Sequence, residues 1–242
     1  VFTRSACFRH RPSQADMLHV DVWWRGQNMA LDPGTFSYNS PFPWNNPLAE
    51  AKYHNAVIVD GQGPMYRPTR FMWLPWPTGL SVFKEFAQET KRSYWQGEHD
   101  GFSDVSGRVR YRRCIQRLDD DHWLVIDRLE SGRQHTYRLQ WLLADHPHDW
   151  DEQNQRLTLH TPKGEYELQL AKTHTQPSVS LVRGNACTPR GWRAYGYQRR
   201  RPALSLASEV TCDCVDFFTL MGRPGTQWNI VDGAIDVTSC LS

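Results

Sequence analysis

The chain has 242 residues, of which 39% are hydrophobic and 22% are charged, as in a folded globular domain rather than a disordered segment. Its net charge of +2 does not predict nucleic-acid binding, and it contains no run of about 18 apolar residues that could form a membrane span. Aromatic residues reach 12%, and such side chains serve both in β cores and in surfaces that stack on sugars.

Short segments of alternating apolar and polar residues recur from end to end, separated by turn residues, and this pattern predicts β-strands. In chain order, the expected strands are Met17–Trp24, Ala56–Val59, Leu80–Ala87, Gly107–Leu118, Trp123–Leu129, Thr136–Leu143, Arg156–Thr161, Glu165–Ala171, Ser178–Val182, Ala203–Val210, Val215–Met221 and Ile235–Thr238. About a dozen strands with little helix favour an all-β fold, a large antiparallel β-sandwich (supersandwich-like) in one domain over residues 1–242. A propeller is the other all-β option, but no blade-length repeat occurs.

Several motifs occur in a fixed order. Pro12-Ser13-Gln14-Ala15-Asp16 precedes an Asp-Pro-Gly-Thr-Phe-Ser-Tyr-Asn turn that begins at Asp32, and a strand runs from His54 to Gln62. Further along stand Gly97–Phe102, Arg108–Arg113, Asp121–Leu129 and the Arg-Gly-Trp of residues 190–192 with Tyr195 and Tyr197. This ordered set resembles the C-terminal β-sandwich domain of heparinase II/III-like polysaccharide lyases.

The resemblance implies a two-domain enzyme, in which an (α/α) toroid precedes the β-sandwich. Such enzymes cleave uronic-acid-containing polysaccharides by β-elimination, in which a base removes the C5 proton and an acid protonates the leaving oxygen. Most catalytic residues would lie on the toroid, which is expected upstream of Val1, so the isolated chain is expected to be inactive. The resemblance also implies a periplasmic or secreted protein, and a metal, generally zinc, in the β domain.

The chain departs from the family pattern at its first motif. Pro12 and Gln14 stand where the family has two histidines, and proline cannot transfer a proton. The resemblance implies that the metal is bound by the second of these histidines, the aspartate of the Asp-Pro-Gly turn and the histidine that opens the following strand. These positions are Gln14, Asp32 and His54 here, and they would hold zinc or another divalent metal. The alternative is a hydrogen-bonded polar cluster without metal. His10 is the candidate to replace the lost catalytic histidine. His19 is expected to face away from Gln14 if residues 14–24 are extended, although a β-bulge would reverse this.

Five residues are candidates for substrate binding, because guanidinium groups suit carboxylate and sulfate and aromatic faces suit sugar rings. They are His99, Trp192, Tyr195, Arg199 and Arg200. The alternative for His99 is a turn stabilised by Asp100 and Gly101, and for the others it is packing or domain contact.

Two functions are therefore expected, with an acidic polysaccharide as the partner in both. The first is the C-terminal domain of a polysaccharide lyase, completed by an N-terminal toroid domain. The alternative is a non-catalytic sandwich that binds acidic glycan after losing the histidine pair. A purely structural sandwich, with neither ligand nor metal, is the third possibility.

Overall fold

A computed structural model describes residues 1–85, 93–171, 176–231 and 234–239. It is almost entirely β-structure, and the two 3₁₀ turns are η1 (Pro47–Ala49) and η2 (Ala51–Tyr53). The strands are β1 (Phe2–Thr3), β2 (Val20–Trp24), β3 (Gln27–Ala30), β4 (Val57–Val59), β5 (Tyr66–Thr69), β6 (Met72–Leu74), β7 (Gly79–Glu85), β8 (Ser93–His99), β9 (Arg110–Arg117), β10 (Trp123–Leu143), β11 (His148–Asp151), β12 (Arg156–Thr161), β13 (Gly164–Leu170), β14 (Ser178–Arg183), β15 (Trp192–Gly196), β16 (Arg199–Pro202), β17 (Leu204–Gly222), β18 (Thr226–Val231) and β19 (Ala234–Ser239).

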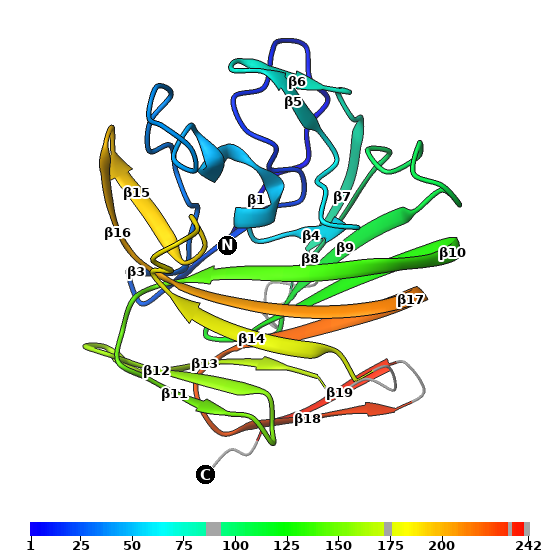
Figure 1. Cartoon of the computed structure of the whole chain (residues 1–242). Coiled ribbons are helices and arrows are strands. Elements are labelled where there is room, and N and C mark those ends of the chain that lie inside the picture. The colour runs from blue at the N-terminus through cyan, green and yellow to red at the C-terminus, as the bar shows by residue number, and fades with distance from the viewer. Residues whose placement is uncertain (86–92, 172–175, 232–233, 240–242) are drawn as a thin grey trace.

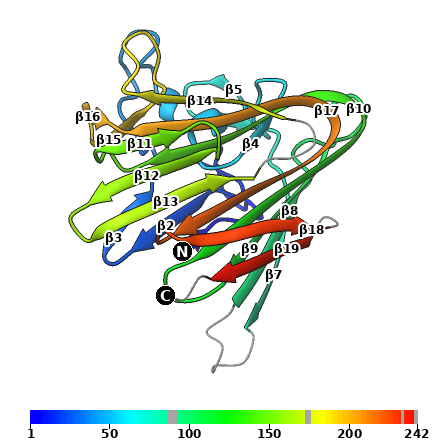
Figure 2. The same cartoon turned by 90° about the horizontal axis from the view of Figure 1, so that it is seen from below.

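The long strands β10 and β17 form the central ribbon of a 13-stranded antiparallel sheet (Figure 1). On the β10 side, the ribbon pairs with β9 at one end and with β4 and β3 at the other. On the β17 side, it pairs with β14 at one end and β13 at the other. The branches curve over one another as stacked layers (Figure 2), so the predicted all-β sandwich is confirmed.

The main core lies between these branches. It is built from the side chains that point inward at every second position along the strands. In β10, for example, Tyr137, Leu139 and Trp141 are all fully buried. Trp24 of β2 packs against Tyr166 of β13, with ring centroids 5.4 Å apart. This contact ties two branches of the sheet together across the core.

The strand predictions were right in type but incomplete. The segments expected at 123–129 and 136–143 are two halves of β10, and those at 203–210 and 215–221 are two halves of β17. A register shift between Glu130 and His135 interrupts the alternation there, which is why one strand looked like two. The end of the segment expected over Leu80–Ala87 lies outside the described residues.

Three hairpins, including β18–β19, stand apart from the large sheet in the described part of the chain, and the other two lie at the same end of the molecule. They are β5–β6 and β15–β16, and they flank the loops that carry the first motifs (Figure 1). Among the described residues, no helix is long and apolar enough to cross a membrane. Five cysteines in the described part of the chain are free thiols, and Cys240 lies outside it.

Candidate metal centre

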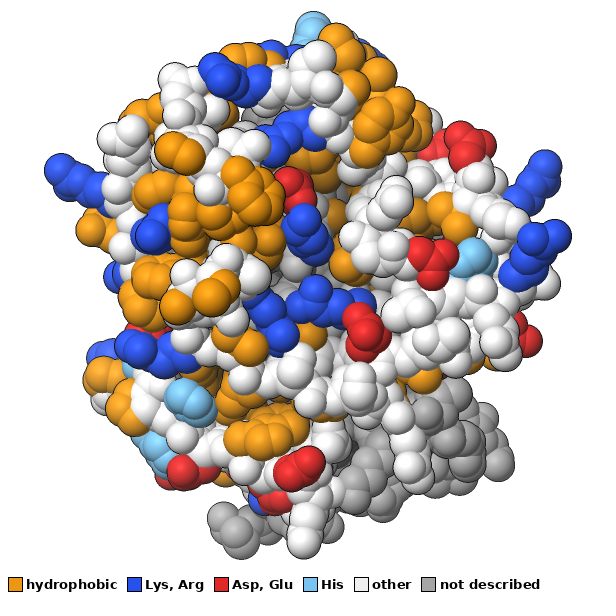
Figure 3. All heavy atoms as spheres, in the orientation of Figure 1, with side chains coloured by type: hydrophobic (Ala, Val, Ile, Leu, Met, Phe, Trp, Pro, Cys, Tyr) orange, Lys and Arg blue, Asp and Glu red, His pale blue; other side chains and the backbone are white. Residues whose placement is uncertain are grey.

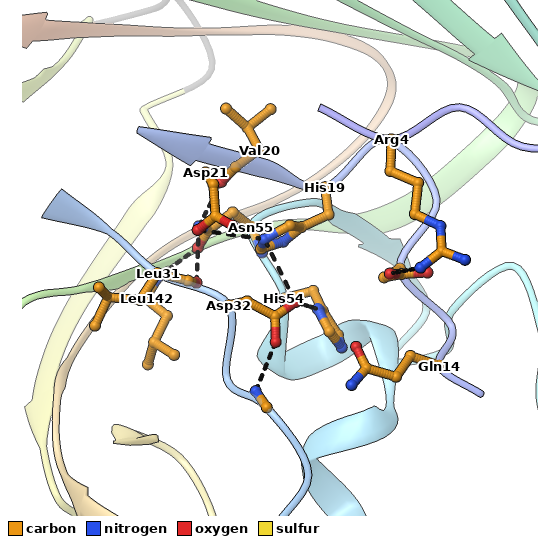
Figure 4. A network of polar contacts seen from close by, with 12 residues as sticks. Arg4, Gln14, His19, Val20, Asp21, Leu31, Asp32, His54, Asn55 and Leu142 are labelled. Carbon is orange, nitrogen blue, oxygen red and sulfur yellow. Dashed lines mark hydrogen bonds and ion pairs between the residues drawn. The ribbon is translucent and has the colours of Figure 1, made fainter. Parts of the chain in front are cut away.

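Three side chains from separate segments converge in one buried cluster, shown in Figure 4. His19 precedes β2, Asp32 follows β3, and His54 lies between η2 and β4. Their possible ligand atoms all lie within 4.8 Å of one another. We refer to His19, Asp32 and His54 as the His–Asp–His cluster.

His19 reaches this cluster because the backbone before β2 is a turn and not an extended strand. Leu18 has a φ of 59°, and the His19 N–H donates to the Asp16 carbonyl. The side chain of His19 is consequently buried beside His54, with ring centroids 5.1 Å apart. The expectation that His19 faces away was therefore wrong, because it assumed continuous alternation from Gln14 onward.

The Asp-Pro-Gly turn positions Asp32. Its Oδ1 accepts a hydrogen bond of 2.6 Å from the Gly34 N–H, which leaves Oδ2 directed at the two histidines. Gly34 has a φ of 72°, and a Cβ there would come within 2.8 Å of the Ala194 carbonyl oxygen. Only glycine fits this close approach between the turn and strand β15.

Asn55 lies next to the cluster, and its side chain bonds to residues in or directly beside the strands around the site. Its Nδ2 donates to the Val20 and Leu31 carbonyls at 2.8 and 3.1 Å, and its Oδ1 accepts from the Leu142 N–H at 2.6 Å. Its backbone N–H donates to His19 Nδ1 at 3.0 Å. Asn55 was not predicted from the sequence, although its place directly after His54 in a matched motif was a usable signal.

The pKa values of His19 and Asp32 both lie below their ordinary values, but for different reasons. Burial and the neighbouring His54 lower the pKa of His19 to about 3, so this ring is neutral. Burial acts to raise the pKa of Asp32, but the side chains of His54 and His19 and the Gly34 N–H outweigh it, so the pKa falls below its usual range. The cluster is therefore an ionised carboxylate facing a neutral imidazole and a second imidazole.

The possible ligand atoms of the cluster fit a divalent cation in part. His54 is fully buried, and neither of its ring nitrogens has a hydrogen-bond partner among the described residues. His54 Nδ1 lies 3.5 Å and His19 Nε2 lies 3.7 Å from Asp32 Oδ2. A carboxylate and imidazole nitrogens without other partners are suitable ligands for zinc.

His19 fits a cation less well than His54. Because its Nδ1 accepts the Asn55 N–H, the neutral ring carries its proton on Nε2, the atom that faces Asp32. Metal binding at Nε2 would require the loss of that proton, whereas a metal-bound histidine normally donates from its other nitrogen. Gln14 lies beside His54 in Figure 4, and its Nε2 donates to Thr35 Oγ1 at 3.4 Å. Its amide oxygen is thus a further possible metal ligand at the cluster.

The other predicted site residues fall in different places. His10 is exposed and is not part of the cluster. His99 is buried at the end of β8, where its Nδ1 accepts from the Gly101 N–H at 3.1 Å, as in the turn interpretation. Burial lowers the pKa of His99 to about 4. Both remain untested as functional residues.

The remaining four residues share the hairpin β15–β16. The Arg200 guanidinium lies 3.4 Å from the ring centroid of Trp44 and 4.9 Å from that of Trp192, so both of these predicted residues are engaged in packing. Tyr195 and Arg199 are exposed. Arg193, which the sequence analysis missed, is half-buried on the same hairpin and close enough to Asp21 and Asp32 for their charges to act on it.

Comparison with known proteins gives one family. The family model described as "Heparinase II/III-like, C-terminal" matches residues 4–224. No curated protein matches the chain.

Solved structures with similar folds are much longer than this chain. A heparinase III has a TM-score of 0.73 at 12% identity, over 93% of this chain and 35% of its own. A heparan sulfate lyase, HepC from Pedobacter heparinus, has a TM-score of 0.69 at 13% identity, over 93% of this chain and 36% of its own. A further heparinase III gene product has a TM-score of 0.69 at 16% identity, over 89% of this chain and 32% of its own. The chain thus spans about a third of their length.

Proposed function

The chain belongs to the heparinase II/III-like C-terminal family, and from that premise we propose that it is the β-sandwich part of a polysaccharide lyase. The substrate would be an acidic polysaccharide that contains uronic acid, and the reaction would be β-elimination. The observation that carries this proposal is the family match across residues 4–224. Such a protein would act in the periplasm or outside the cell.

The chemistry of β-elimination indicates what this chain contributes. A base must remove the C5 proton, an acid must protonate the leaving oxygen, and the uronate carboxylate must be neutralised. In the described part of the chain, His19 and His54 are too deeply buried to reach a sugar, at 2% and 0% exposure, and Pro12 carries no proton to exchange. We therefore assign proton transfer to a second, N-terminal toroid domain.

The His–Asp–His cluster would then have a structural role. We propose that Asp32 and His54, with the Gln14 amide oxygen, bind a divalent metal, zinc or a harder ion. When bound, the ion would supply a positive charge that fixes the Asp-Pro-Gly turn against the start of β4. Elemental analysis after metal-replete purification tests this. About one equivalent supports it, and less than about a tenth would favour the hydrogen-bonded cluster.

The lyase proposal is tested with uronate polymers and the absorbance of the unsaturated product. A longer protein that joins this chain to an N-terminal toroid domain should release product, and the isolated chain should release none. Turnover by the isolated chain would contradict the assignment of proton transfer to the other domain. A longer protein without activity on heparan-type, alginate-type and capsular uronate polymers would contradict the lyase.

A binding module is the second candidate, and the β15–β16 hairpin favours it. Tyr195 and Tyr197 are 59% and 53% exposed, and Arg199 lies beside them. Exposed aromatic faces with nearby guanidinium groups suit the rings and acidic groups of a glycan. If the longer protein binds a uronate polymer without cleaving it, and Tyr195→Ala weakens the binding, this candidate replaces the lyase.

A further inference from the structure

A polar cavity of about 480 Å³ lies on the outer face of the sheet, where β10, β14 and β17 run side by side. It does not contain any residue of the His–Asp–His cluster. Its lining includes the polar or charged side chains of Lys52, Tyr53, Arg138, Ser180, Arg190 and Glu209. Figure 3 shows Lys and Arg side chains gathered near the middle of this face beside an acidic one.

Arg138 brings to the cavity a guanidinium that has few hydrogen-bond partners among the described residues. It projects from β10 at the position paired with Glu209 of β17. Its Nη2 donates to Gln140 Oε1 at 3.2 Å, and within the described residues its guanidinium makes no other hydrogen bond and no ion pair within 4.0 Å. Most of its five N–H donors therefore remain free.

Arg190 brings a second guanidinium to the same cavity. Its Nε donates to Ser205 Oγ at 2.8 Å, and its Nη2 donates to the carbonyl and hydroxyl of Ser180 at 2.8 and 2.9 Å. These bonds fix the orientation of the group and leave Nη1 available. Burial lowers the pKa of Arg190 to about 10, and the charge of Arg138 acts in the same direction, so the two cations repel each other.

The negative charge around the two guanidinium groups is small. Glu209 is the one carboxylate in the cavity lining, and it acts on both Arg138 and Arg190. Lys52 is already paired, with its Nζ 2.5 Å from Glu50 Oε2. The cavity thus holds a fixed excess of positive charge that a bound anion would relieve.

We propose that this cavity binds an oxyanion, such as a sulfate group, between Arg138 and Arg190, with the Tyr53 hydroxyl as a further donor. Guanidinium forks match sulfate oxygens in geometry and charge. The anion could come from a sulfated saccharide or from free inorganic sulfate, which share this chemistry. The proposal does not depend on lyase activity, so its test is separate from the activity assay.

The test is calorimetric titration of the isolated chain with sodium sulfate and with a sulfated uronate oligosaccharide, against sodium chloride at matched ionic strength. Sulfate should bind where chloride does not, and Arg138→Gln should weaken it by about tenfold. The matched control is Arg128→Gln, which removes the same charge roughly 33 Å further along β10, where Arg128 pairs with Asp216. This control should leave the affinity unchanged.

A second variant should bind sulfate more tightly, and a gain of affinity cannot be caused by misfolding. Glu209→Gln removes the competing carboxylate and should tighten sulfate binding by about threefold. Binding of both ligands with loss in Arg138→Gln assigns the site to a saccharide, and binding of inorganic sulfate alone assigns it to a free anion. No sulfate binding, or an equal loss in Arg128→Gln, would overturn the proposal.

Discussion

His19 illustrates what the sequence could and could not predict about single residues. Asp32 and His54 lie side by side, as expected from their motifs, because each motif carries its own local turn. His19 was assigned to the wrong face because the positive φ of Leu18 breaks the alternation, and leucine gives no sequence signal for such a backbone. Its neighbour Asn55 was missed because its partners are backbone groups of distant strands.

The role of Gln14 can be tested by restoring the histidine that the family pattern places there. Gln14→His would put an imidazole in place of an amide beside His54 and Asp32. Imidazole is a better zinc ligand than an amide oxygen, so zinc affinity should rise by about tenfold or more. Competition against a chelating dye measures this. In the same variant, adding His54→Gln should abolish the gain, and a gain that persists would place the metal elsewhere.

The buried His99 predicts a specific dependence of stability on pH. Its folded-state pKa of about 4 lies below the ordinary value of 6.5, so between these values only the unfolded chain takes up the proton. The free energy of unfolding should therefore fall as pH drops from about 6.5 to 4, by about 3 kcal/mol in total. His19 acts in the same direction down to about pH 3. Urea unfolding at a series of pH values measures the slope.

The variant His99→Gln should flatten that slope, because glutamine has no proton to take up. His160→Gln is the control. The pKa of His160 is raised by its hydrogen bond to Asp149, and this contribution has the opposite sign. An unchanged slope in His99→Gln would show that His99 is protonated in the folded protein.

At the level of elements, strands with clean alternation were predicted, whereas strands without it, such as β3, β8 and β16, were not. The strand expected at Arg156–Thr161 coincides with β12, whose inward Leu157 and Leu159 are fully buried. Strand β16 was missed because it reads Arg-Arg-Arg-Pro, and its Arg200 lies over the rings of Trp44 and Trp192. That contact joins β16 to the loop of Trp44, and no pattern of neighbouring residues in the sequence predicts it.

Asn55 links the ends of three segments, and its loss should therefore weaken the whole sheet around the cluster. Asn55→Ala leaves the Val20 and Leu31 carbonyls and the Leu142 N–H buried without partners. Each such group costs about 1 kcal/mol or more, so the free energy of unfolding should fall by about 3 kcal/mol. Thermal or urea denaturation measures it. Asn28→Ala, which loses one 3.5 Å bond to Asp21, should change stability by less than about 1 kcal/mol.

At the level of the whole molecule, one end carries several large apolar side chains that are exposed. On and beside the β5–β6 hairpin, Tyr66, Phe71, Met72 and Trp76 are exposed by 60%, 46%, 44% and 43%. Figure 3 shows apolar side chains gathered at the end of the molecule where Figure 1 draws this hairpin. Contiguous apolar surface of this kind is typical of a contact with another domain. The amino-acid composition alone does not predict this exposed surface, because the same residue types also fill β cores.

The proposed toroid domain should therefore cover the β5–β6 hairpin, and a polar substitution there should act on the longer protein alone. Met72→Ser should change the stability of the isolated chain by no more than about 0.5 kcal/mol, because the side chain is already half exposed. In a protein that carries both domains, it should weaken their contact, lower lyase activity and separate the two unfolding transitions in calorimetry. Val82→Ser, at a 51% exposed position on β7, is the control. Equal effects of the two substitutions on the longer protein would show that the domains meet elsewhere, since only a surface buried between them distinguishes Met72 from Val82.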